Sequence, residues 1–154
     1  MGAVFEGKNA APGKRFAVAA GRFNEFIVKA LVDGAVRTLE GAGGAVDVAW
    51  CPGAVELPLV AQKLAETGRY DAVVAIGCVI RGGTPHFDYV AGMAANGVAR
   101  ASQSTGVPIS FGVLTVDSIE QAIERAGTKM GNKGAEAALA AIEMATLLPT
   151  LGAE

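Results

Sequence analysis

One histidine and the glycine-rich turn beside it are the residues of this chain best suited to chemistry. Residues 80–89 read Ile-Arg-Gly-Gly-Thr-Pro-His-Phe-Asp-Tyr and contain His86, the only histidine of the protein. If a helix begins here, its free backbone N–H groups and its dipole attract anions. Gly82 and Gly83 let a ligand approach the backbone closely, and Thr84 adds a hydroxyl. Because His86 exchanges protons near neutral pH, the segment predicts a phosphate-binding turn beside a proton-transfer group.

Two other turns contain residues that are common in ligand sites, and each residue has a second, structural interpretation. Phe23 is either a helix-start staple or core residue, or an aromatic platform for a planar ring. Asn24 is either a helix cap alone or a polar contact. Glu56 is either a surface carboxylate that compensates a helix dipole or a substrate contact.

Three cations surround the glycine-rich loop at residues 127–134. Arg125, Lys129 and Lys133 are ordinarily read as a solvated helix end and loop. They are also suited to grip a phosphate, Arg125 through its planar guanidinium. Individually these signals are weak to moderate, and together, at the ends of strands in one sheet, they are stronger.

The elements that position these residues follow from the alternation of short apolar runs with helical periodicity. Strands are predicted at residues 16–20, 46–50, 72–80 and 108–116, whose starts lie roughly 30 residues apart, the length of a strand-helix-strand unit. Helices are predicted between and after these strands, at about residues 24–41, 57–67, 89–103, 117–127 and 134–148.

Helix signals mark several of these boundaries. In the first helix Asn24 is a plausible N-cap, Gly41 a stop, and an apolar stripe begins at Phe26. Pro58 fits best in a first helical turn. Asp117 and Glu120 resemble a capping box, which opens the fourth helix.

The apolar character of both faces of each strand predicts a parallel sheet that helices cover on both sides, with right-handed crossovers. Such a domain has three layers, α/β/α, and binds its ligands beyond the carboxyl ends of the strands. Residues 4–6 are a candidate short strand that would add to the sheet edge of a neighbouring subunit.

Composition limits the class of protein. A chain of 154 residues is expected to form one domain, here with an arm at residues 1–14 and a core at 15–150. The formal net charge of −2 argues against a sequence-independent grip on nucleic acid. The hydrophobic content of 51% occurs without an apolar run of the ~18 residues that a membrane span needs. We therefore expect burial between subunits and no membrane partner.

The cysteines and the N-terminus indicate a cytoplasmic protein. Cys51 and Cys78 lack metal-ligand spacing and are expected to be reduced, buried small residues. Residues 1–16 carry four charged side chains and no continuous apolar core, so no signal peptide is expected. We predict no metal site.

Five segments, in order along nearly the whole chain, resemble the lumazine synthase family. They are residues 22–24 (Arg-Phe-Asn), 53–56 (Gly-Ala-Val-Glu), 80–89, 111–115 (Phe-Gly-Val-Leu-Thr) and 120–134. The resemblance implies a flavodoxin-like fold and the condensation of 5-amino-6-(ribitylamino)uracil with 3,4-dihydroxy-2-butanone 4-phosphate. The product is 6,7-dimethyl-8-ribityllumazine, phosphate and water are released, and no cofactor is involved. This is the penultimate step of riboflavin biosynthesis.

The resemblance also implies a role for each matching residue. Phe23 matches the aromatic that stacks on the pyrimidine, and His86 the proton-transfer residue. Arg125 matches the phosphate clamp, and Phe111 and Lys133 match residues that an adjacent subunit contributes. The remaining positions match contacts to the ribityl chain, the pyrimidine ring and the phosphate: Asn24, Ala54, Val55, Glu56, Val79, Ile80, Gly83 and Thr84.

Assembly and alternative functions follow from the same resemblance. It implies a homo-pentamer with shared sites, and the short turn at 127–134 favours a sixty-subunit icosahedral shell, with an enclosed riboflavin synthase as a candidate partner. The alternative function is a catalytically silent shell protein that binds flavin or lumazine. An archaeal-type riboflavin synthase is disfavoured, since its substrate carries no phosphate. Gly21 and Val55 depart from the residues frequent in the family, which leaves pyrimidine affinity open.

Overall fold

A four-stranded parallel sheet forms the centre of the molecule. The computed structural model describes residues 2–152. The sheet order is β2-β1-β3-β4, and every neighbouring pair is parallel. The predicted strands are confirmed to within one residue at each end: β1 (Arg15–Gly21), β2 (Ala45–Cys51), β3 (Ala72–Ile80) and β4 (Ile109–Val116).

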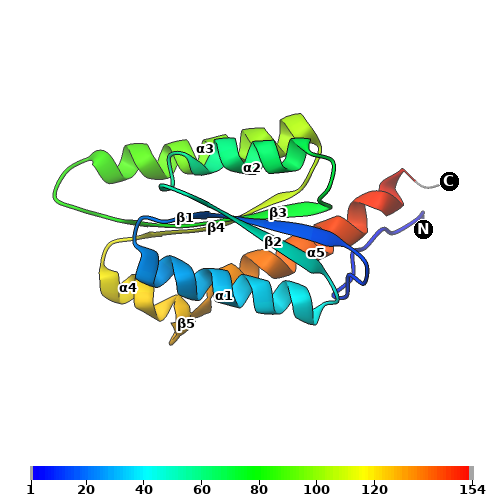
Figure 1. The fold of residues 1–154 in the computed structure, drawn as a ribbon, viewed down its shortest axis with the longest axis horizontal. Helices are drawn as coiled ribbons and strands as arrows, with labels where there is room; N and C mark the ends of the chain where they lie inside the picture. Colours follow the sequence, from blue (N-terminus) through cyan, green and yellow to red (C-terminus); the bar gives the residue numbers. More distant parts are fainter. Residues whose placement is uncertain (1, 153–154) are drawn as a thin grey trace.

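Helices cover both faces of this sheet, which confirms the predicted three-layer fold (Figure 1). Helices α2 (Leu57–Glu66) and α3 (His86–Thr105) lie on one face. Helices α1 (Glu25–Gly41), α4 (Ile119–Glu124) and α5 (Lys133–Leu151) lie on the other. Successive residues of a strand point to opposite faces, so each strand supplies both cores.

The edge strand β2 departs from the prediction that both faces of every strand are covered. β1 and β3 are buried almost throughout. In β2, by contrast, Val48 and Trp50 are 41% and 38% exposed. The reason is position: β2 has a sheet neighbour on one side only, and within one chain the helices cover it only in part. Its apolar residues are available to a partner surface.

Helix α1 begins and ends where predicted, but no side-chain hydrogen bond caps its start. Asn24 occupies the N-cap position, yet its side chain makes no capping hydrogen bond. Gly41 is the last helical residue. Phe26, which we predicted in the buried stripe, is 78% exposed, so the stripe begins one residue later at Ile27. Pro58 lies in the first turn of α2, as predicted.

The start of α4 corrects the predicted capping box by one residue. The Ser118 hydroxyl accepts the Gln121 N–H at 3.2 Å, and the Gln121 side-chain oxygen accepts the Asp117 N–H at 2.7 Å. Asp117 cannot serve as the cap because its carboxylate pairs with Arg81 at 2.9 Å. The helix ends at Glu124, three residues before the predicted Gly127.

A small hairpin that we did not predict replaces part of the glycine-rich loop. Strands β5 (Ala126–Thr128) and β6 (Gly131–Asn132) pair antiparallel. Gly127 and Gly131 adopt φ angles of 109° and 79°, a left-handed region that favours glycine. The hairpin returns the chain so that the Lys133 N–H donates to the Arg125 carbonyl at 2.9 Å.

The N-terminal arm lies along α5. The Lys8 N–H donates to the Thr146 hydroxyl at 2.7 Å, and a Cβ on Gly7 would stand 2.2 Å from the Glu143 carbonyl oxygen. Residues 4–6 form no strand within the single chain, and Val4 and Phe5 are 67% and 51% exposed. Their addition to a neighbour's sheet stays a prediction.

Helix α5 is the one helix within residues 2–152 that is long and apolar enough, by length and composition, to cross a membrane. A third of its most apolar stretch is buried inside the molecule. The core helix of a globular domain shows the same hydropathy, so the pattern is weak evidence for a span.

The first turn of α5 crosses α1 at very short range. A Cβ on Gly134 would stand 2.0 Å from the Leu31 carbonyl oxygen. Asn132 fastens the crossing, because its side-chain amide donates to the Ala30 carbonyl at 3.1 Å and its oxygen accepts the Ala135 N–H at 3.1 Å. This crossing fixes the position of Lys133.

We expect Gly134→Ala to lower the free energy of unfolding by about 1–3 kcal/mol, because the added methyl group must push two helix backbones apart. Chemical denaturation of the variant measures the loss. Gly41→Ala is the matched control: an added Cβ there meets nothing within 4 Å, so stability should stay unchanged or rise slightly. Equal stability of the Gly134 variant and the wild type would contradict the tight crossing.

Candidate active site

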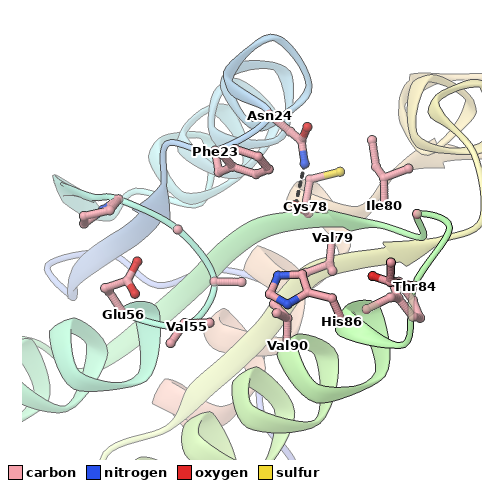
Figure 2. Close-up of a pocket in the computed structure, with 15 residues that line it drawn as sticks. Phe23, Asn24, Val55, Glu56, Cys78, Val79, Ile80, Thr84, His86 and Val90 are labelled. Carbon is pink, nitrogen blue, oxygen red and sulfur yellow. Dashed lines mark hydrogen bonds between the residues drawn. The ribbon is translucent and has the colours of Figure 1, made fainter.

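The sheet order places a pocket between the carboxyl ends of β1 and β3. β1 continues into α1 on one face, whereas β3 continues into α3 on the other. Where neighbouring strands send their helices to opposite faces, a crevice opens in which α/β proteins bind ligands. The pocket found here has a volume of about 440 Å³ (Figure 2).

Most predicted site residues line this first pocket, namely Phe23, Asn24, Ala54, Val55, Glu56, Val79, Ile80, Thr84 and His86. Gly83 lies in the same turn, but its neighbour Gly82 is the glycine that borders the pocket. The sequence analysis missed Cys78, Phe87 and Val90. Helical spacing provided a signal for Val90, which lies one turn beyond His86 on α3.

Phe23 and Asn24 border the pocket from the turn after β1 (Figure 2). The Phe23 side chain is 74% exposed, which excludes the core interpretation and leaves its ring free to stack on a planar ligand. Asn24 has a φ of 64°, a region that asparagine tolerates better than most residues. Its side-chain amide donates to the Cys78 carbonyl at 2.9 Å, which ties the turn after β1 to β3.

The turn after β2 reaches the pocket because it packs closely against the end of β1. The N–H groups of Arg22 and Phe23 donate to the carbonyls of Cys51 and Pro52 at 2.7 and 2.9 Å. A Cβ on Gly21 would lie 2.9 Å from the Gly53 carbonyl carbon. Glycine at position 21 therefore allows this approach, and a larger residue there requires the turn that carries Val55 and Glu56 to shift.

The opposite wall contains the turn between β3 and α3. Helix α3 begins at His86, three residues earlier than predicted, so the histidine stands in the first helical turn and is exposed. A Cβ on Gly82 or Gly83 would meet nothing within 4 Å, so the space beside the turn is open to a ligand. Open glycine backbone at the positive end of a 20-residue helix is an anion-binding arrangement.

Both cysteines are free and buried, as predicted, and neither is prepared to act as a nucleophile. Burial raises the pKa of the Cys78 thiol to about 11, and Cys78 borders the pocket. Burial also raises the pKa of Cys51, with a further contribution from the Glu56 carboxylate. Because the thiolate is the reactive form, both thiols are neutral and inert near pH 7.

A second pocket of about 420 Å³ opens at the outer edge of β4. It collects the remaining predicted residues, Phe111, Arg125 and Lys133, together with Met130 and Glu136, which the sequence analysis missed. Strand β4 supplies Phe111, the end of α4 supplies Arg125, and the first residue of α5 supplies Lys133. The predicted third cation, Lys129, does not border this pocket.

The guanidinium of Arg125 is partly held in place by its own helix. One nitrogen donates to the Gln121 carbonyl at 3.1 Å and lies 3.6 Å from the Glu124 carboxylate. Its side chain is 37% exposed, so part of the fork remains open to a ligand.

The two pockets contain complementary chemistry. Among the described residues, the first pocket is lined by an aromatic ring, amide and carboxylate groups, an anion-binding turn and a histidine, but by no lysine or arginine. The second is lined by two cations and an aromatic ring. A phosphate ester bound in the first pocket would therefore find its fixed positive charges only if a second pocket faced it. Within residues 2–152, no cluster of three His, Cys, Asp or Glu side chains could hold a metal ion.

Comparison with known proteins finds one family for this chain. The family model described as 6,7-dimethyl-8-ribityllumazine synthase matches residues 13–149. The matched region contains every residue of both pockets.

Proposed function

Because the chain belongs to the 6,7-dimethyl-8-ribityllumazine synthase family, whose members are transferases of riboflavin biosynthesis, we propose that it carries out the family reaction itself. It condenses 5-amino-6-(ribitylamino)uracil with 3,4-dihydroxy-2-butanone 4-phosphate. The observation that carries this proposal is the first pocket, in which an exposed aromatic ring faces an anion-binding turn with His86 at the helix start.

The pyrimidine binds on the side of the first pocket formed after β1 and β2. Phe23 stacks on the planar ring. This stacking favours binding in addition to the contribution from the apolar area that is removed from water. Asn24 and Glu56 contact the ribityl hydroxyls, and the backbone around Ala54 and Val55 orients the ring. Val79 and Ile80 close the apolar floor.

The butanone phosphate binds at the turn of Gly82, Gly83 and Thr84. The 5-amino group of the pyrimidine adds to the ketone, and loss of one water gives an imine. Proton loss from the adjacent hydroxyl-bearing carbon expels phosphate and leaves an enol, which tautomerises to a new ketone. Attack of the ribitylamino nitrogen on this ketone releases a second water and closes the ring. His86 carries protons in these steps, since a histidine is matched to transfer near pH 7. Holding both substrates in register supplies much of the rate.

The charges that stabilise the leaving phosphate come from the second pocket of a neighbouring subunit. A departing phosphate gains negative charge, and a guanidinium already fixed by its own helix, as in Arg125, stabilises it without reorganisation. Lys133 adds a second cation, and Phe111 closes the ring pocket. Each site then needs two chains, which requires a closed ring, and we propose a homo-pentamer.

We propose that pentamers assemble further into a sixty-subunit shell, with an enclosed riboflavin synthase as the candidate partner. The support is the short β5–β6 hairpin together with apolar side chains that the single chain leaves exposed, among them Trp50, Leu139 and Met144. The free, buried cysteines suit a protein that works in the cytoplasm.

Mixing the protein with both substrates should raise lumazine absorbance well above the uncatalysed rate. We expect Arg125→Ala to lower kcat/KM by at least about tenfold more than His86→Ala, because water or phosphate can partly replace a proton carrier but not a fixed cation. Lys29→Ala, on the exposed face of α1, is the control and should retain wild-type activity. Equal losses for the two site variants would contradict this ranking, and tight flavin binding without turnover would instead favour a silent binding protein.

Complementation tests whether two chains share a site. One chain carries Phe23→Ala with His86→Ala, and the other carries Arg125→Ala. Each assembly alone should be nearly inactive, whereas co-expression should restore about a quarter of wild-type activity, since about one site in four then combines two intact halves. Activity no higher than that of the separate variants would exclude the shared site.

Light scattering of the native assembly at neutral pH should give the mass of sixty chains. A stable pentamer-sized species in several buffers would refute the shell but leave the shared site intact.

A further inference from the structure

Arg81 makes an unusual set of contacts directly before the phosphate-binding turn. Its guanidinium lies 2.9 Å from the Asp117 carboxylate, which follows β4. It also lies 3.5 Å from the Asp88 carboxylate in the first turn of α3. The guanidinium carbon lies over the Phe87 ring, 4.3 Å from its centroid, and the backbone N–H of Arg81 donates to the Val116 carbonyl at 2.8 Å.

The turn that follows has few contacts of its own. A Cβ on either glycine would meet nothing within 4 Å, and residues 82–84 donate no backbone hydrogen bond to the rest of the described chain. Within the described chain, the position of this turn is therefore set by the residues at its two ends, β3 before it and α3 after it. Arg81 binds both, because it continues β3 on one side and contacts Phe87 and Asp88 of α3 on the other.

We propose that Arg81 is a positioning residue for the phosphate-binding turn. It does not border either pocket, so it acts through the turn rather than on the substrate. The flat guanidinium spans two carboxylates and rests on an aromatic face at the same time, a geometry that an ammonium group cannot reproduce. In this role Arg81 sets the direction of the N–H groups of Gly82, Gly83 and Thr84.

Because these charged groups are partly exposed, their effect on the turn can be measured separately from any effect on the free energy of unfolding. The side chains of Arg81, Asp88 and Asp117 are 45%, 63% and 69% exposed, and such ion pairs contribute little to the free energy of unfolding. Their loss should therefore leave the fold intact and change the turn alone. Charge-assisted hydrogen bonds to phosphate depend strongly on distance and direction, so a displaced turn weakens phosphate binding.

The inference rests on the proposed function, and the experiment separates the two. Arg81→Lys keeps the charge but removes the planar fork. We expect its KM for the butanone phosphate to rise about tenfold, its KM for the pyrimidine to stay within about twofold, and its inhibition by inorganic phosphate to weaken in parallel. Arg81→Met should show a larger rise in the same direction.

Arg37→Lys is the matched control, because Arg37 pairs with Asp33 at 3.1 Å on the exposed face of α1, away from both pockets. Its kinetics should equal those of the wild type, and denaturation midpoints of all variants should agree closely. If Arg81→Lys has wild-type KM values, or if both KM values rise together, the positioning role is wrong. If the wild-type protein forms no lumazine, the proposed function fails first.

Discussion

The site depends on one constraint of the sheet, the adjacency of β1 and β3. Parallel strands must be joined by crossovers, and the chain leaves β1 toward one face and β3 toward the other. The backbone is therefore parted at the carboxyl ends of these two strands, and the ligand pocket is the space left there (Figure 2). The bond from the Asn24 side chain to the Cys78 carbonyl keeps the two sides at a fixed distance. Asn24, in a left-handed conformation, thus uses its side chain to link the two sides of the pocket and not to cap its helix.

The sequence was sufficient for the strands and most helices because burial determines them. Residues 72–80 are apolar without interruption and rich in β-branched residues, a pattern typical of a strand covered on both faces. Short-range chemistry was harder to predict. The capping pair at α4 moved by one residue because Asp117 was already engaged by Arg81, a contact across 36 positions that no local pattern reveals. The β5–β6 hairpin was missed for a related reason, since its glycines are also typical of an irregular loop.

The resemblance already assigned Phe111 and Lys133 to an adjacent subunit, but nothing in the sequence placed Arg125 with them in a second pocket. Residue types alone place Arg125 and Lys133 beside any phosphate site, whereas the fold puts them at the outer edge of β4, in a different pocket from the anion-binding turn. The separation has a physical consequence. An isolated chain presents an anion-binding turn in a pocket that no lysine or arginine lines, and a pair of cations in a second pocket that has no such turn. In the proposed pentamer, the turn of one chain would meet the cations of its neighbour, and the exclusion of water from the space between them would strengthen the charge interactions there.

Close contacts between backbone segments determine where the side chains of both pockets begin. Gly21 permits the turn after β2 to rest against β1, and Gly134 permits the first turn of α5 to rest against α1. Neither glycine touches a pocket, yet each fixes the origin of side chains that do: Glu56 in the first case and Lys133 in the second. Backbone contacts of this kind resist displacement more than contacts between flexible side chains, because a rigid chain cannot change rotamer to relieve a clash. A long side chain such as that of Lys133, or an exposed one such as that of Phe23, can therefore still begin from a well-defined point.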